Sequence, residues 1–332
     1  MKKKALLISL AALLVILVLL VIIIPLTAST SNSEPRRIFL PEDTTHEALV
    51  DTLQANGILN EGLNTTVFNF QFSILKSKVR PGSYVVEPHV KELSLVRHLR
   101  NGMQTPLRLT IGKFRTPQQL NEHLNNKLMH NDFNIPLNSF HLILPDTYEV
   151  YWTINPEQFM QRMEDEYNRF WTTEVGPQGE LRCDLLELSD NGNARLETMI
   201  LASIVDEETN NNGEKPLIAS VYLNRLRRGM PLQADPTVKY AVGDFTLRRI
   251  LNKHLATESP FNTYLHAGLP PAPICLPSKA SIDAVLQAPE TGYLYFCASE
   301  QLDGTHRFAT TLDEHNQNAK KYHRAISTLG KN

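Results

Sequence analysis

Residues 196–213 read LETMILASIVDEETNNNG, and this stretch decides how the part of the chain that carries chemistry is expected to fold. Its apolar residues recur with the spacing of one helix face, which predicts a helix; they are Leu196, Met199, Ile200, Ile204 and Val205. The run Asp206, Glu207, Glu208 ends this helix, and the Asn-rich segment 210–213 breaks it. Three acids at a helix C-terminus oppose the macrodipole, which favours cations there. The run is therefore either a solvated acidic turn or a functional site.

The angular positions of the three acids narrow this choice. At about 100° per residue, Asp206 falls on the side opposite the apolar stripe, whereas Glu207 and Glu208 both flank it. Apolar surroundings raise the pKa of a carboxylic acid, which is what a general acid at neutral pH requires. The pattern leaves Glu207 and Glu208 as equal candidates.

Two further helix starts follow this stretch. Pro216 opens a helix that stops at Gly229, and the arginines near its end, such as Arg225, suit the helix dipole and are expected to be structural. Asp235 is expected to be the N-cap of the next helix, with Pro236 at its first position. Capping and sugar binding are compatible roles for Asp235.

The C-terminal part of the chain combines a rigid loop with a hairpin. Gly268 and the three prolines within 270–273 form a rigid loop, and the polar segment Asn262–Tyr264 before it suits the wall of a saccharide groove. Tyr293–Phe296 is expected to be a strand that pairs with His306–Phe308, and the final helix opens near residue 314.

The N-terminus predicts a membrane anchor. An almost unbroken apolar run extends from Ala5 to Leu26, and three lysines precede it. At about 1.5 Å per residue this run reaches roughly 33 Å, enough to cross a bilayer core, and it is longer than the apolar part of a signal peptide. The lysines favour a cytoplasmic N-terminus, with everything after about residue 30 outside the cytoplasmic membrane. Cleavage at the small residues 27–29 stays an alternative.

We expect an α+β protein whose parts differ in character. The expected parts are the cytoplasmic stub and anchor (1–28), a linker (29–35), a small α+β module (36–106), a connecting region (107–195) and a larger α+β domain (196–332). The module has the order β-α-α-β-α, which fits either a spacer or a carbohydrate-binding module of LysM type. In the connecting region, 144–148 is expected to be a turn and the breaker-rich segment 176–193 a linker or surface excursion.

Composition excludes several classes of function. Lys and Arg total 33 against 35 Asp and Glu, so the chain lacks the basic charge of a nucleic-acid-binding protein. Cys183, Cys275 and Cys297 form no CxxC pair, and they are either one disulfide with one thiol or three thiols. The C-terminal histidines match no zinc motif, and no G-x-S-x-G nucleophile elbow occurs. We expect neither a metal nor another cofactor.

Several strings between residues 199 and 324 resemble the catalytic region of the endolytic murein transglycosylases, the YceG-like (MltG) family. The matching strings are Ala202–Val205 followed by acids, Ala219–Val221 with Asn224–Leu226, Gly229–Gln233, Asp235–Val238, Asn262–Tyr264, Gly268–Pro271, Tyr293–Phe296, His306, Phe308 and His315–Asn316. The segment 144–148, the anchor and the small LysM-like module fit the same family. The chain departs from the family pattern at Asp206, Phe261 and Cys275-Leu276.

The resemblance implies a catalytic residue and a reaction. The family has two glutamates separated by one residue, of which the second is the catalytic acid, and Asp206 and Glu208 stand at these places. The implied reaction is non-hydrolytic cleavage of the MurNAc-β-1,4-GlcNAc bond within glycan strands, which leaves 1,6-anhydroMurNAc ends and terminates nascent strands. The residues expected to bind the glycan are Asn224, Gln233, Asp235, Thr237, Asn262, Thr263, Tyr264, Tyr295 and His306.

The resemblance also implies a location and partners. The protein is expected in the bacterial cytoplasmic (inner) membrane as a single-pass protein with its N-terminus inside. The expected partners are peptidoglycan glycan strands, the membrane and, by resemblance alone, cell-wall synthesis proteins.

Two other functions remain open. A muramidase-type hydrolase would need a second carboxylate near Glu208. Glu197 lies eleven residues earlier, roughly 16 Å along one helix, so Asp235 is the only partner we name. A non-catalytic peptidoglycan-binding scaffold is the other alternative, and it predicts binding without cleavage.

Overall fold

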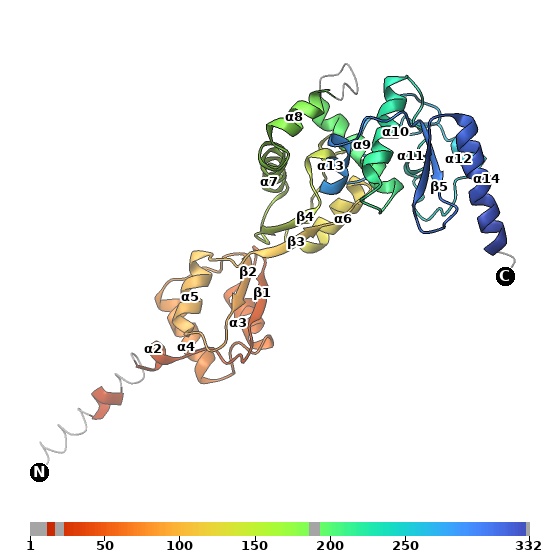
Figure 1. Ribbon diagram of the computed structural model, residues 1–332. Helices are drawn as coiled ribbons and strands as arrows, with labels where there is room; N and C mark the ends of the chain where they lie inside the picture. The colour runs from red at the N-terminus through yellow and green to blue at the C-terminus, as the bar shows by residue number, and fades with distance from the viewer. Residues whose placement is uncertain (1–11, 17–22, 186–192, 330–332) are drawn as a thin grey trace, which may run out of the picture. The chain divides into compact units, whose positions relative to one another are not determined.

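The computed structural model describes residues 12–16, 23–185 and 193–329. Most of the predicted anchor lies outside these ranges, and within them no helix is both long and apolar enough to cross a membrane. Contacts divide the chain into two compact units, of which the first comprises the residues up to Leu109 together with 127–131 and 148–154. Figure 1 shows their elements. The boundaries expected at residues 36, 107 and 196 stay predictions.

The first unit has the predicted order of strands and helices. Strand β1 (Arg36–Leu40) pairs antiparallel with β2 (Gly82–Val86), so that Ile38 lies opposite Tyr84. The helices of this unit are α2 (Ile24–Thr27), α3 (His46–Ala55), α4 (Leu63–Ile74) and α5 (Glu92–Asn101). Their apolar faces enclose a core that includes Ile38, Leu49, Leu53, Phe68, Val96 and Leu99.

The segment 29–35 does not have the character of a linker. The Thr30 and Ser31 amides donate to the carbonyls of Val90 and Ile58, both at 2.8 Å. The Asn32 amide nitrogen donates to the Val86 carbonyl at 3.0 Å. These hydrogen bonds join the segment to distant parts of the first unit, and its composition, which is rich in Ser, Thr and Asn, does not reveal such partners.

The segment 144–148 is only partly the expected turn. Strand β3 (Leu107–Ile111) pairs with β4 (Asp146–Val150), and β4 therefore begins inside this segment. Tyr148 and Val150 are buried and alternate with polar neighbours, so the period of a strand continues directly from the turn residues.

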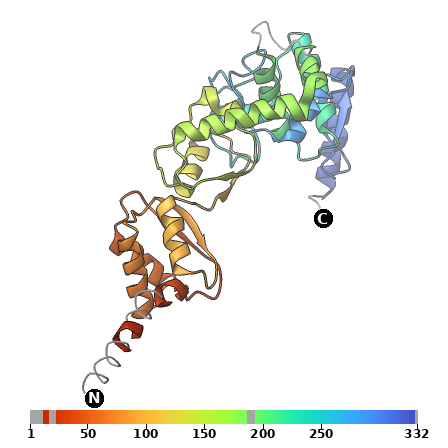
Figure 2. The same cartoon turned by 90° about the vertical axis from the view of Figure 1, so that its left-hand side faces the viewer.

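The segment 176–193 was also read wrongly over its first half. Helix α7 (Pro156–Arg169), seen end-on in Figure 1 and lengthwise in Figure 2, runs into a π-helix η3 (Phe170–Val175) and then into α8 (Gly176–Leu185). Gly176 has a φ of 69°, which lets the chain turn there, and a proline at the start of the next helix is favourable. The remainder, 186–192, and the Cys183 side chain lie outside what the structure describes.

The second unit is organised around α9 (Ala194–Glu208). This helix is buried along most of its length and packs with α10 (Lys215–Arg227), α11 (Asp235–Val242) and α13 (Lys279–Leu286). Their shared core includes Trp171, Met199, Ile204, Ile218, Tyr222 and Val285. The helix predicted from the opening stretch is thereby confirmed.

The predicted hairpin is confirmed with a shift of two residues in its first strand. Strand β5 (Tyr295–Ala298) pairs antiparallel with β6 (His306–Ala309), which places Phe296 opposite Phe308. The final helix α14 (Leu312–Leu329) packs on both strands. The other elements are α6 (Pro117–Lys127), η2 (Leu137–Leu142) and the short α12 (Asn252–Leu255). Cys275 is buried and Cys297 is partly exposed, and both are free thiols.

Candidate active site

A cavity of about 310 Å³ opens at the C-terminal end of α9. Its walls come from α9, α10, the start of α11, the hairpin and the first turn of α14. The lining residues are Glu208, Tyr222, Arg225, Leu232, Gln233, Asp235, Tyr264, Tyr295, Phe296, Leu312 and His315. Aromatic and polar groups thus surround a single glutamate at the end of a buried helix.

Glu208 is the last residue of α9, and its carboxyl group lies in this cavity. Burial and the nearby Asp235 carboxylate raise its pKa to about 7, although a hydrogen bond from Tyr222 and the charge of Lys239 favour the ionised form. Its Oε2 atom is buried and has no hydrogen-bond partner among the described residues. Glu208 can therefore be protonated near neutral pH, and its Oε2 atom is not engaged by any other described residue.

Glu207 is separated from the cavity and held by cations. Lys113 Nζ and Arg115 Nε each lie 2.9 Å from its carboxylate oxygens. Both cations follow strand β3 in the chain. The geometry thus distinguishes the two glutamates that the helical angle alone left equal.

Asp206 is buried, which overturns the reading of the acidic run as a solvated turn. Its Oδ1 accepts hydrogen bonds from Lys215 Nζ at 2.8 Å, from Ser278 Oγ at 2.7 Å and from Ser281 Oγ. Burial alone would raise its pKa, but these bonds and the charge of Lys113 lower it to about 2. Lys113 Nζ also donates to the Asp206 carbonyl at 2.6 Å, and so supplies the cation that the helix C-terminus favours.

Asp235 lines the cavity but does not cap α11 as expected. Ala234 occupies the N-cap position, and Asp235 is the first residue of the helix. Because its side chain is free of the capping role, its Oδ1 accepts a hydrogen bond from the Tyr264 hydroxyl at 2.8 Å. Asp235 is thus a second carboxylate in the same cavity, near enough to Glu208 to affect its pKa, which sequence could not establish.

Three polar residues of the cavity wall were missed as site residues. The Tyr222 hydroxyl is bonded to Glu208. Arg225, expected to be only structural, donates to the Leu294 and Leu232 carbonyls at 2.7 and 2.9 Å and lies 5.2 Å from the Tyr295 ring centre. The His315 ring packs at a tilt against the Tyr295 ring, with ring centres 5.5 Å apart. The spacing of Tyr222 and Arg225, three residues apart on one helix, was the available signal.

Of the residues expected to bind glycan, Gln233, Asp235, Tyr264 and Tyr295 line the cavity and the others do not. Asn224 donates to the Thr291 and Tyr293 carbonyls, Asn262 to those of Leu255 and Thr257, and His306 bonds to Glu214. The hydroxyls of Thr237 and Thr263 lie 2.8 Å apart, and both are buried. The geometry gives these five a structural part, and their direct contact with glycan stays a prediction.

The buried threonines support the cavity from behind. The backbone N–H of Gln233 donates to the Thr263 carbonyl at 3.1 Å, and the backbone N–H of Ala234 donates to the Thr263 hydroxyl at 3.1 Å. Gln233 has a φ of 50°, a conformation that non-glycine residues rarely adopt without such support. Among the described residues, no group of three His, Cys, Asp or Glu side chains is arranged to hold a metal ion.

Two substitutions should move the pKa of Glu208 in opposite directions. Asp235→Asn removes a negative charge that disfavours the ionised form, so the pKa should fall below about 7. Tyr222→Phe removes a hydrogen bond that favours the carboxylate, so the pKa should rise. Carbon NMR titration of the labelled Glu208 carboxyl measures both shifts. Asp303→Asn, at an exposed loop, is the control, and shifts of one sign in both variants would contradict the assigned contacts.

Comparison with known proteins gives a family and a fold. The model of the YceG-like family matches residues 38–321. A crystal structure of a YceG-like protein from Listeria monocytogenes has a TM-score of 0.53 and 23% identity, covering 86% of this chain and 99% of that one. This likeness concerns the fold.

Curated relatives match a shorter segment. The endolytic murein transglycosylase of Bacillus subtilis (strain 168) is 44% identical over 124 residues, which are 37% of this chain and 34% of that protein. The protein of the same name from Streptococcus pneumoniae (strain D39) is 32% identical over 130 residues, or 38% of this chain and 23% of that protein. The chain thus matches about a third or less of the length of these relatives.

Proposed function

The chain belongs to the YceG-like family, and we propose that it is an endolytic murein transglycosylase that cleaves the MurNAc-β-1,4-GlcNAc bond within glycan strands. The observation that carries this proposal is Glu208, an acid with a pKa near 7 in a cavity walled by aromatic and polar groups. The names of the bacterial relatives support the same activity. Cleavage of this kind would terminate the elongation of nascent strands.

In the proposed reaction Glu208 acts twice. As the neutral acid it donates its proton to the glycosidic oxygen, and the bond between that oxygen and C1 of the muramyl residue breaks. As the carboxylate it then takes the proton of the muramyl C6 hydroxyl, whose oxygen bonds to C1. The product is a 1,6-anhydro ring, and Glu208 ends protonated as it began. Because the nucleophile belongs to the substrate, one carboxylate suffices.

Asp235 favours a second candidate function, that of a muramidase-type hydrolase. Its carboxylate lines the same cavity and is close enough to Glu208 to raise the pKa of that group. A hydrolase of this kind uses a second carboxylate as nucleophile or base. Against this role, the Tyr264 hydroxyl donates a hydrogen bond to Asp235 Oδ1, which occupies one of the two carboxylate oxygens that a nucleophile or base would use.

The length of digested strands tests whether the protein cleaves internally. Purified glycan strands incubated with the full chain should lose length before short end products accumulate, since an endolytic enzyme cuts at internal bonds. Chromatography of the strands over time measures this. Strands that bind the protein and keep their full length would indicate the scaffold instead.

We further propose the location and the partners. The protein is anchored in the cytoplasmic membrane by residues 5–26 with its N-terminus inside, and the chain after about residue 30 lies outside the cytoplasm. The support is the apolar run and the lysines before it. Cell-wall synthesis proteins are the proposed partners, because an enzyme that cuts nascent strands acts where they are made.

The anchor predicts a specific fractionation. The protein should stay in the membrane pellet after a carbonate wash, because an apolar helix across the bilayer is not released by high pH. Protease added to spheroplasts should degrade the chain beyond about residue 30. A soluble mature form that begins near Ser29 would identify the segment as a cleaved signal.

A further inference from the structure

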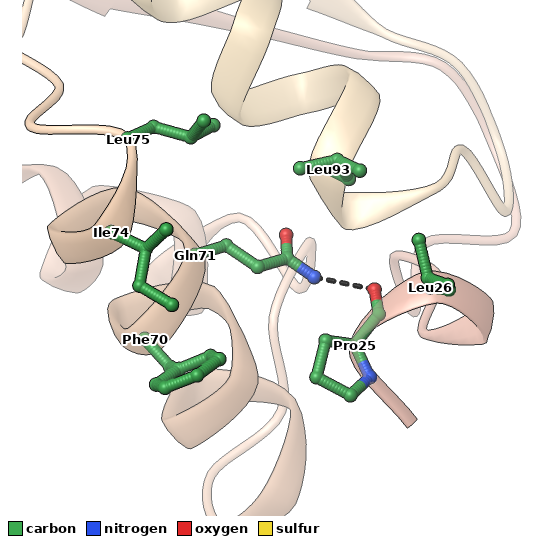
Figure 3. A pocket seen from close by; sticks show the side chains of 7 residues that line it. All are labelled: Pro25, Leu26, Phe70, Gln71, Ile74, Leu75 and Leu93. Atoms are coloured by element: carbon green, nitrogen blue, oxygen red, sulfur yellow. Dashed lines mark hydrogen bonds between the residues drawn. The ribbon is translucent and has the colours of Figure 1, made fainter. Parts of the chain in front are cut away.

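An apolar groove lies on the first unit, where α2 meets α4 and α5 (Figure 3). Its volume is about 250 Å³. We call it the α2–α4 groove; its lining residues are Pro25, Leu26, Phe70, Gln71, Ile74, Leu75 and Leu93. All but one of these side chains are apolar, and none belongs to the candidate active site.

The rim of this groove is unusually open for apolar side chains. Leu26, Phe70 and Ile74 are 53%, 40% and 62% exposed. Phe70 and Ile74 are four residues apart on α4, and Leu63, also exposed, lies seven residues before Phe70 on the same face. Single exposed apolar residues are common, but a contiguous patch of them indicates a surface that contacts a membrane or another protein.

The groove is attached rigidly to the end of the predicted anchor. Pro25 and Leu26 are the last residues of the apolar run, and they form one wall. Gln71 Nε2 donates to the Pro25 carbonyl at 2.6 Å, as Figure 3 shows, and the Glu92 amide donates to the Ala28 carbonyl at 3.0 Å. No flexible segment therefore separates the groove from residue 26, and a bilayer that holds the run must reach the groove.

Two polar features suit the groove to lipid headgroups. Lys76 and Lys78 are exposed and follow Leu75 at the end of α4, within reach of anionic headgroups. Gln71, which also lines the groove, has a buried Oε1 with no hydrogen-bond partner among the described residues. Apolar side chains beside exposed lysines form the pattern of a surface that lies in the membrane interface.

We infer that the α2–α4 groove rests in the outer leaflet of the cytoplasmic membrane, with Phe70 and Ile74 among the upper acyl chains and Lys76 and Lys78 at the headgroups. This inference rests on the proposed anchor and goes beyond it, because it fixes the first unit against the lipid surface. The occupant of the groove is lipid, and a helix of another protein or a second copy is an outcome of the test.

Quenching by lipid tests this placement in the full chain. The protein is reconstituted in vesicles of phosphatidylethanolamine and phosphatidylglycerol whose acyl chains carry bromine near the headgroup. The variant Ile74→Trp is compared with Met103→Trp, because Met103 is 57% exposed and follows the opposite end of α5 from Leu93. The two ends of α5 are roughly 15 Å apart. The fluorescence of the parent protein, which has Trp152 and Trp171, is subtracted.

The expected result is a loss of most of the added fluorescence at position 74, with a blue shift in unbrominated vesicles, and no loss at position 103. Lys76→Gln with Lys78→Gln should weaken the quenching at position 74 in anionic vesicles only. Equal quenching at 74 and 103, or none at 74, would overturn the inference, as would cross-linking of two copies through position 74. If the protein resists a carbonate wash but shows no quenching at position 74, the proposed anchor is supported and the placement of the groove in the membrane is wrong.

Discussion

Glu208→Gln is expected to abolish cleavage of glycan strands while folding and glycan binding persist. The substitution keeps the size and hydrogen-bonding shape of the side chain and removes its transferable proton. General acid–base catalysis contributes ~10²–10⁴-fold, and a group that acts in both proton transfers should be at the upper end. The rate of anhydro-product release, with circular dichroism and a strand-binding assay beside it, measures the effect.

Glu207→Gln is the matched control for this experiment. Glu207 is the adjacent residue of the same helix, but its carboxylate contacts Lys113 and Arg115 and does not line the cavity. Its loss should change stability slightly and leave most of the activity. An inactive Glu207→Gln beside an active Glu208→Gln would show that the wrong carboxylate has been assigned.

Asp206→Ala should have the largest effect on stability. The carboxylate is buried and pairs with Lys215, which is itself buried. Removing one partner of a buried ion pair leaves the other charge uncompensated and typically lowers the free energy of unfolding by about 3–5 kcal/mol. Urea unfolding followed by circular dichroism measures the loss.

The double variant Asp206→Ala with Lys215→Met separates the charge effect from the packing effect. It removes both charges and should recover much of the loss, because no buried charge is left unpaired. If the double variant were less stable than Asp206→Ala by as much again, the stabilisation would lie in packing and the ion pair would contribute little.

The pH dependence of stability follows from the same residue. The pKa of Asp206 is depressed from its ordinary 3.8 to about 2 in the folded protein. The unfolded chain therefore binds a proton first as the pH falls, and the contribution of Asp206 is present above 3.8 and lost toward about 2. Asp206→Ala should flatten the unfolding free energy across this window.

Much of the fold could be predicted because, in several segments, apolar periodicity and turn residues indicate the same helix or strand. The helix from 194 to 208, the hairpin of β5 and β6, and the order of elements in the first unit follow from local pattern. The continuation of α7 through η3 into α8 could not be predicted in this way. Gly176 and Pro177 are compatible with a linker and also with a turn into a new helix. In the structure the preceding residue Trp171 is packed in the core, and local sequence does not show this long-range contact.

The candidate site was predicted only in part, because some of its features follow from local pattern and others depend on contacts between distant parts of the chain. The angle of Glu208 on its helix follows from sequence, but its separation from Glu207 depends on Lys113 and Arg115, about ninety residues earlier in the chain. Polar residues such as Asn262 and Thr263 resemble ligand-binding residues in sequence. In the structure the Asn262 side chain donates to two backbone carbonyls, and the Thr263 hydroxyl bonds to the Ala234 amide and the Thr237 hydroxyl. Long-range pairing of this kind leaves no local signal.

In the proposed reaction one carboxylate, that of Glu208, suffices because the substrate supplies the nucleophile. The most direct test of this reaction is the mass of the muramyl ends produced from purified glycan strands by the full chain in water enriched in heavy oxygen. We expect ends that lack the elements of water and carry no heavy oxygen, because the C6 hydroxyl closes the ring. Ends heavier by one water, with heavy oxygen at C1, would contradict this and show that the protein is a hydrolase.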